Sequence, residues 1–76
     1  MNSHTREFLQ HDDYTISVES RRPDAESRWM ITVTIYKGDK RVLPPRRDDD
    51  RSYDDLDKAE DAGIKLGREL IAGLPA

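Results

Sequence analysis

Residues 28–36, RWMITVTIY, decide the fold of this 76-residue chain. Large apolar side chains occur at every second position, a period that is typical of a β-strand with one buried face. Most of these residues are β-branched or aromatic, which strands favour. The side chains predicted to face the core are Trp29, Ile31, Val33 and Ile35, and those predicted to face solvent are Met30, Thr32, Thr34 and Tyr36.

The same alternation occurs upstream, where Tyr14, Ile16 and Val18 predict a second strand that ends before the loop at Pro23. Downstream, KGDK (37–40) predicts a tight turn, because Gly38 is free to take a positive φ. Residues 41–43, RVL, then predict a short third strand that the following two prolines end. We therefore expect a three-stranded antiparallel meander.

The C-terminal part of the chain predicts one long helix. Asp54 is placed as its N-cap, with Asp57 three residues further on as in a capping box, and Gly73 and Pro75 as its end. One stripe of the helix is apolar or small: Leu56, Ala59, Ala62, Gly63, Leu66, Gly67 and Leu70. Each glycine costs a helix about 1 kcal/mol relative to alanine, so both indicate close approach of helix and sheet, beneath Trp29.

These elements predict a two-layer α+β fold, β-β-β-α, with a three-stranded antiparallel sheet packed on one C-terminal helix. Residues 13–74 are expected to form a single domain, and residues 1–12 a flexible or weakly structured tail. The predicted core is small, since 34% of the residues are hydrophobic and 38% charged. Its members are Tyr14, Ile16, Val18, Trp29, Ile31, Val33, Ile35, Leu56, Ala59, Gly63, Leu66 and Leu70.

Residues 44–57, PPRRDDDRSYDDLD, are interpreted as a solvated loop that leads into the helix. Carboxylates near a helix N-terminus complement its partial positive charge, so they need no ligand. A calcium loop starting at Asp48 fails on spacing: Ser52, Tyr53 and Ala59 stand where the pattern requires an Asp or Asn, a Gly and a Glu. Weak binding of divalent cations to the acidic run is left open.

The residue types disfavour an enzyme and a cofactor. The chain has no cysteine, which excludes disulfides, thiolate zinc sites and cysteine nucleophiles. The two histidines, His4 and His11, lie in the predicted tail and are interpreted as solvated. No serine has a matched histidine and acid, and the carboxylates are predicted to lie on exposed surfaces. No metal or cofactor is expected.

Location is inferred from hydropathy alone. No apolar run approaches the roughly 18 residues that cross a bilayer, and the N-terminal residues lack the apolar stretch of a signal peptide. We expect a cytoplasmic protein without membrane contact.

Charge is segregated along the sequence. Residues 21–47 hold eight lysines and arginines against three acidic residues, whereas residues 48–61 hold eight acidic residues against two basic ones. Such a distribution can steer partners. Five arginines at predicted strand ends are the candidate contacts for nucleic acid or another anion: Arg21, Arg22, Arg41, Arg46 and Arg47.

The strand pair YTISVES and WMITVTIY, the turn KGDK and the helix SYDDLDKAEDAGIKLGRELI resemble a group of short stand-alone bacterial proteins of uncharacterised function, over residues 12–73. The resemblance implies a fold and a bacterial source, and it carries no functional residues. The predicted function is a non-catalytic protein-interaction or accessory module, as a monomer or a weak homodimer with an unknown protein partner. The alternative is an RNA- or DNA-binding module that uses the five arginines.

Overall fold

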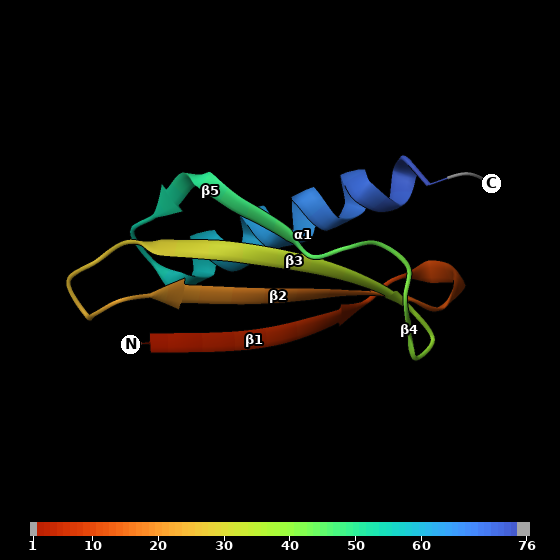
Figure 1. Ribbon diagram of the computed structural model, residues 1–76, viewed down its shortest axis with the longest axis horizontal. Coiled ribbons are helices and arrows are strands. Elements are labelled where there is room, and N and C mark those ends of the chain that lie inside the picture. The colour runs from red at the N-terminus through yellow and green to blue at the C-terminus, as the bar shows by residue number, and fades with distance from the viewer. Residues whose placement is uncertain (1, 75–76) are drawn as a thin grey trace.

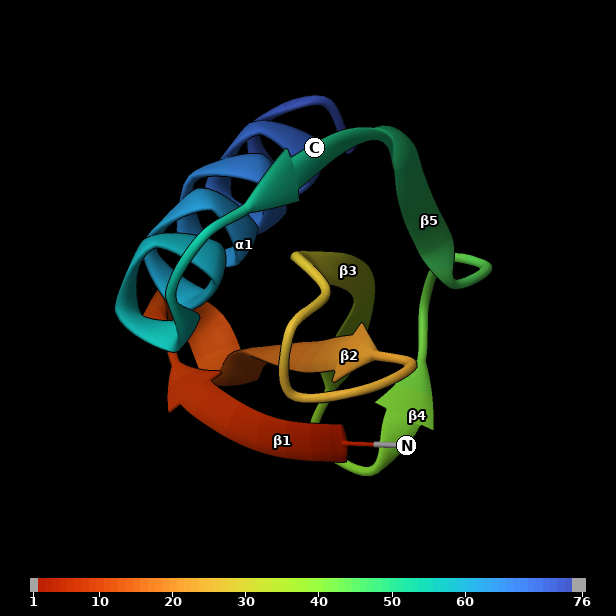
Figure 2. The same cartoon turned by 90° about the vertical axis from the view of Figure 1, so that its left-hand side faces the viewer.

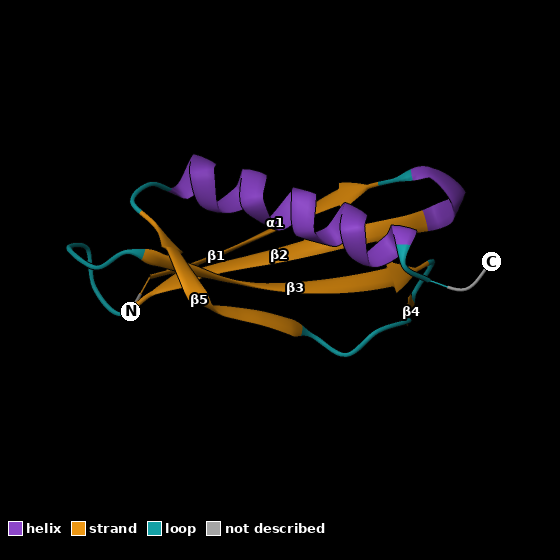
Figure 3. Ribbon diagram, turned by 90° about the horizontal axis from the view of Figure 1, so that it is seen from above, coloured by secondary structure: helices purple, strands orange, loops and turns teal. Residues whose placement is uncertain are grey.

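The computed structural model describes residues 2–74, which form an antiparallel sheet and one long helix (Figure 1). The strands are β1 (Asn2–Leu9), β2 (Tyr14–Arg22), β3 (Trp29–Lys37), β4 (Lys40–Arg41) and β5 (Arg46–Tyr53). A single 3-10 turn, η1 (His11–Asp13), joins β1 to β2, and the helix α1 is Leu56–Ala72. The α+β class with one C-terminal helix on an antiparallel sheet is confirmed (Figure 3).

The sheet has five strands, so the predicted number of three is wrong. Its order is β1-β2-β3, and both β4 and β5 pair with the far edge of β3. The central register joins Ile16 to Ile35 and Val18 to Val33, which brings four β-branched core residues together on one face. The predicted alternation along β2 and β3 is confirmed, because each strand buries every second residue.

The predicted flexible tail forms β1 instead. Residues 2–9 pair with β2 along their whole length, from Asn2 opposite Arg22 to Leu9 opposite Thr15. Most β1 side chains are exposed on both faces, and only Phe8 packs against the core. Backbone hydrogen bonds to β2 therefore stabilise most of β1. Such bonds do not require apolar residues at every second position, so the sequence shows no strand period here.

The predicted loop of residues 46–53 forms β5, and the predicted third strand shortens to the two residues of β4. Arg46 pairs with Val33 and Asp48 with Ile31, and a bulge precedes the pairing of Tyr53 with Trp29. Figure 2 shows β5 crossing from the sheet edge to the side on which α1 lies. Aspartate is disfavoured in strands, so composition predicted a loop here.

The core lies between α1 and strands β2 and β3. Its buried side chains are Ile16, Val18, Trp29, Ile31, Val33, Ile35 and Ala59. Tyr14, Leu56, Leu66 and Leu70 from the predicted core are partly buried against it. The glycines do permit close approach, but Gly63 lies against Val18 and Gly67 against Ile16, on β2 and not beneath Trp29.

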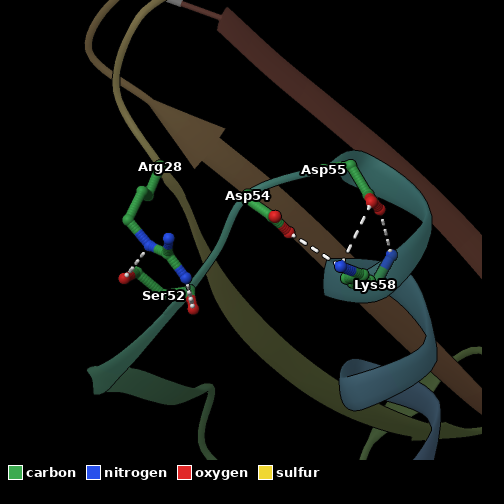
Figure 4. Close-up of polar contacts among 5 residues, drawn as sticks. All are labelled: Arg28, Ser52, Asp54, Asp55 and Lys58. Carbon is green, nitrogen blue, oxygen red and sulfur yellow. Dashed lines mark hydrogen bonds and ion pairs between the residues drawn. The ribbon is translucent and has the colours of Figure 1, made fainter.

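The N-cap of α1 is Asp55, one residue later than predicted. Its Oδ1 accepts a hydrogen bond from the backbone N–H of Lys58 at 2.8 Å, while the ammonium of Lys58 contacts Asp54 at 3.2 Å (Figure 4). Gly73 is the C-cap and donates to the carbonyl of Glu69, whereas Pro75 lies outside the described residues. Within residues 2–74, no helix has the length and apolar character needed to cross a membrane.

Candidate binding face

The face of the sheet opposite α1 is the candidate binding surface, and we call it the open face. Cross-strand pairing assigns its residues, because directly opposed side chains in an antiparallel pair share a face. They are Ser3, Thr5, Glu7 and Leu9 of β1, Thr15, Ser17, Glu19 and Arg21 of β2, Met30, Thr32, Thr34 and Tyr36 of β3, Arg41 of β4 and Arg47 of β5. The residues on β2 and β3 are half-buried, because neighbouring strands flank them.

The five candidate arginines do not form one patch. Arg21, Arg41 and Arg47 lie on the open face, whereas Arg22 and Arg46 occupy the alternate positions that face the helix side. The predicted set is therefore split between the two faces of the sheet by its alternation.

Arg22 has a structural role. Its guanidinium lies 4.4 Å from the ring centroid of Trp29, and Nη1 donates to the carbonyl of Ala25 at 3.2 Å. A cation over an indole face is attracted by the ring quadrupole. These contacts hold the loop between β2 and β3 against the end of the core.

A groove of about 430 Å³ lies on the open face. Strands β2 and β3 form its floor, β1 one side, and the chain before and within β5 the other. Its lining residues are Thr5, Ser17, Glu19, Arg21, Thr32, Thr34, Pro45 and Arg47. Hydroxyl and guanidinium groups dominate this lining, so the groove is suited to hydrogen bonding with polar groups.

Arg21 is held in place within this groove by the neighbouring strands. Its Nη2 donates to Thr32 Oγ1 at 3.3 Å, and its Nε lies 3.3 Å from Glu19 Oε1. The Nε is buried and makes no hydrogen bond within the described residues, because the carboxylate is near but not aligned with it. Arginine has five N–H donors, so this guanidinium retains donor capacity.

A second, larger groove of about 830 Å³ separates β5 from α1. Acidic side chains such as Asp48, Asp50 and Asp61 alternate there with Arg46 and Lys65. The charges largely compensate one another across the groove, which is typical of a solvated surface. Among the side chains that the structure describes in residues 2–48 and 50–74, no three metal-ligating ones gather.

One carboxylate contradicts the expectation that all lie on exposed surfaces. Glu60 of α1 is only 6% exposed, and its Oε2 lies 3.7 Å from Nη1 of Arg6 on β1. The strand that brings Arg6 to this position was missing from the sequence prediction, which explains the error. Of the two histidines from the predicted tail, His4 lies near the start of β1 and His11 in η1 after its end, so they do not share a site.

Two parts of the groove were not predicted. Thr5 was assigned to the flexible tail, and Pro45 was treated only as a strand terminator. No side-chain pattern in the sequence indicates either position, since both depend on how β1 and β5 pair.

Comparisons with protein-family models, with curated proteins and with solved structures found no match to this chain.

Proposed function

We propose that this protein is a non-catalytic protein-interaction module that binds its partner on the open face. The observation that carries the proposal is the groove over β2 and β3, where half-buried hydroxyls surround the positioned guanidinium of Arg21. The helix side of the same two strands is filled by the core. One face thus supplies stability and the other is free for recognition.

Rigid support favours a recognition role for this face. Ile16, Val18, Val33 and Ile35 are fully buried on the other side of the same strands. Binding groups carried by well-packed strands keep their geometry and lose little entropy when a partner binds.

A catalytic role is less well supported. Nucleophilic catalysis by a hydroxyl needs an adjacent base. The open face as defined above carries hydroxyls, arginines and two glutamates, without an imidazole. Glu19 is already engaged in an ion pair with Arg21 at 3.3 Å.

Binding of single-stranded nucleic acid is the second candidate, favoured by one observation. Arg21, Arg41 and Arg47 share the open face with Tyr36, over six residues of β3 or roughly 20 Å. Glu7 and Glu19 on the same face oppose a phosphate chain, and one aromatic ring offers few stacking positions. We therefore place this function second.

The source, the cellular location and the oligomeric state are part of the same proposal. The resemblance to short bacterial proteins implies a bacterial source, and the hydropathy favours the cytoplasm. A monomer or a weak homodimer is expected.

A displayed library of random peptides, screened in parallel with a random RNA pool, tests the proposal. Peptides that bind should lose binding to Thr34→Leu, which narrows the groove and removes a hydroxyl without adding charge, and keep it to Ala72→Leu, which adds the same side chain on the exposed last turn of α1. Peptides that bind both variants equally would refute the open face as the binding surface. Enrichment of RNA alone, lost on Arg21→Gln, would establish the second candidate.

A further inference from the structure

We infer that the groove of the open face contains a carboxylate subsite, formed by Arg21, Thr32 and Arg47, that receives an acidic side chain of an extended partner peptide. The inference rests on the proposed function and specifies the chemistry of the partner.

The first part of the subsite is the unused donor capacity of Arg21. Its side chain is 33% exposed, with Nη2 on Thr32 Oγ1 and the buried Nε 3.3 Å from Glu19 Oε1, which leaves N–H groups of Nη1 and Nη2 for a partner. A carboxylate accepts two parallel N–H groups from one guanidinium, and such charge-assisted pairs are stronger than neutral ones. Thr32 and Glu19 fix the plane of the guanidinium before any partner arrives.

The second part is the position of Arg47. The β3–β5 register sets Arg47 directly opposite Thr32, so two arginines flank one hydroxyl across three strands. Both line the same groove with Thr34 and Ser17. Two guanidinium groups and a hydroxyl that line the same groove favour an oxyanion there.

The arrangement favours a peptide over a polynucleotide. Glu19 lies next to Arg21 and opposite Thr5, and Glu7 occupies the adjoining position on β1. A continuous chain of phosphates would be repelled by both carboxylates along its length, whereas a single acidic side chain meets only Glu19, whose charge Arg21 balances. The remaining hydroxyls of the groove are placed to hydrogen-bond the peptide's own backbone.

The size of the groove agrees with a side chain and a short piece of main chain. Its volume of about 430 Å³ lies near the lower end of the roughly 300–1,000 Å³ typical of small-molecule pockets. It lies on the sheet surface between β1 and β5, where an extended segment can lie over the strands.

The test is an amide NMR titration of the ¹⁵N-labelled full chain with acetyl-Thr-Thr-Glu-Thr-Thr-amide and with the matched peptide in which glutamine replaces the glutamate. The glutamate peptide should shift the amides of Glu19 to Arg21, Thr32 and Arg47. The glutamine peptide should bind about tenfold more weakly or worse, since it loses a charge-assisted pair. The same loss is expected for Arg21→Gln, and none for the exposed helix variant Arg68→Gln.

Thr32→Val is the second variant, because valine keeps the strand-favouring shape and removes the hydroxyl that positions Arg21. It should weaken the glutamate peptide and leave the glutamine peptide unchanged. Well-dispersed spectra of both variants would show that each is folded.

Several results would overturn the subsite. If both peptides shift the open face equally, with no effect of Arg21→Gln, the subsite is wrong although the proposed function survives. If the glutamate peptide gives no shift at the named amides at millimolar concentration, the subsite is likewise wrong, and the library screen decides the proposed function separately. If octauridylate shifts these amides and the peptide does not, the groove serves nucleic acid.

Discussion

Gly63 of α1 lies directly against Val18 of β2: a Cβ built at position 63 would come within 2.5 Å of Val18 Cγ1. One turn later, Gly67 has the same relationship with Ile16, at 2.5 Å from its Cγ2. The two glycines lie four residues apart and therefore on one side of the helix. They let the helix backbone approach β2 more closely than any residue with a side chain would allow.

Gly63→Ala should destabilise the protein by about 1–2 kcal/mol, although alanine is the better helix former. The new methyl would also lie 2.7 Å from Val18 Cγ2, so helix and strand must separate. Urea unfolding followed by Trp29 fluorescence measures the change. Gly73→Ala is the matched control, because a Cβ there has no neighbour closer than 3.6 Å. A Gly63→Ala variant as stable as the wild type would contradict the close approach.

Asp55→Ala should cost about 1 kcal/mol, because it removes the acceptor for the backbone N–H of Lys58. Asp55→Asn should retain most of the stability, since asparagine is an equally good N-cap. Thermal unfolding of the two variants provides the comparison. Equal melting temperatures for Asp55→Ala and the wild type would show that this side chain does not cap α1.

Arg28 links the start of β3 to the end of β5. Its Nε donates to Ser52 Oγ at 2.8 Å and its Nη2 to the carbonyl of Ser52 at 3.0 Å (Figure 4). Arg28→Ala should cost about 1 kcal/mol, since the pair is exposed, and should accelerate amide exchange in β5.

Ser52→Ala and the double variant complete the cycle for this pair. The losses in free energy of unfolding for the two single variants should sum to more than the loss for the double variant, because the hydrogen bond from Arg28 Nε requires both side chains. Additive losses of stability would contradict the bond from Nε to the Ser52 hydroxyl, and unchanged exchange in β5 for Arg28→Ala would show that Arg28 does not hold the strand.

The pKa of Asp24 is lowered from 3.8, first by the hydrogen bond from the Ser27 hydroxyl and then by the backbone N–H of Glu26. A lowered pKa in the folded state means that the unfolded chain binds the proton more tightly. This contribution to stability is therefore present above the unfolded pKa and is lost as pH falls through the folded one. Ser27→Ala should move the pKa of Asp24 back toward 3.8, as measured by carboxyl NMR titration.

Asp54 is the internal reference in that titration. Its pKa is also lowered, first through the hydrogen bond from the Lys58 ammonium, and it should not respond to Ser27→Ala. A joint shift of both carboxyls would indicate a general change in the folded state and contradict a local effect of Ser27.

The elements predicted from sequence are those whose side chains are buried at a regular period. Strands β2 and β3 each pack one face on the helix, so buried apolar residues alternate with polar ones along them. This alternation can be detected in the sequence, as it is for Ile16, Val18, Ile31 and Val33. β1 and β5 gain their place through backbone pairing at the sheet edges. This pairing uses the backbone N–H and C=O groups, which do not depend on the side chain, so a strand made of charged residues has no side-chain pattern that would predict it.

Part of the open face could also be predicted from the alternation along β2 and β3. Alternation along β2 and β3 correctly assigned Thr32 and Thr34 to the face away from the core. It does not assign Arg46 and Arg47 to opposite faces, because the composition around them predicts a loop and a loop has no alternation. The groove, which needs Arg47 and Pro45 on one side, depends on a strand register that no local pattern specifies.

Charge on the outermost strands also bears on how the protein behaves at high concentration. Six of the eight residues of β5 are charged, and Arg6 and Glu7 lie side by side in β1. Charged edge strands discourage a sheet from adding a strand of another molecule, which is the first step toward aggregation. Asp48 and Asp50, which the sequence suggests as ligands or loop residues, can therefore be understood as protection of a sheet edge against strand addition.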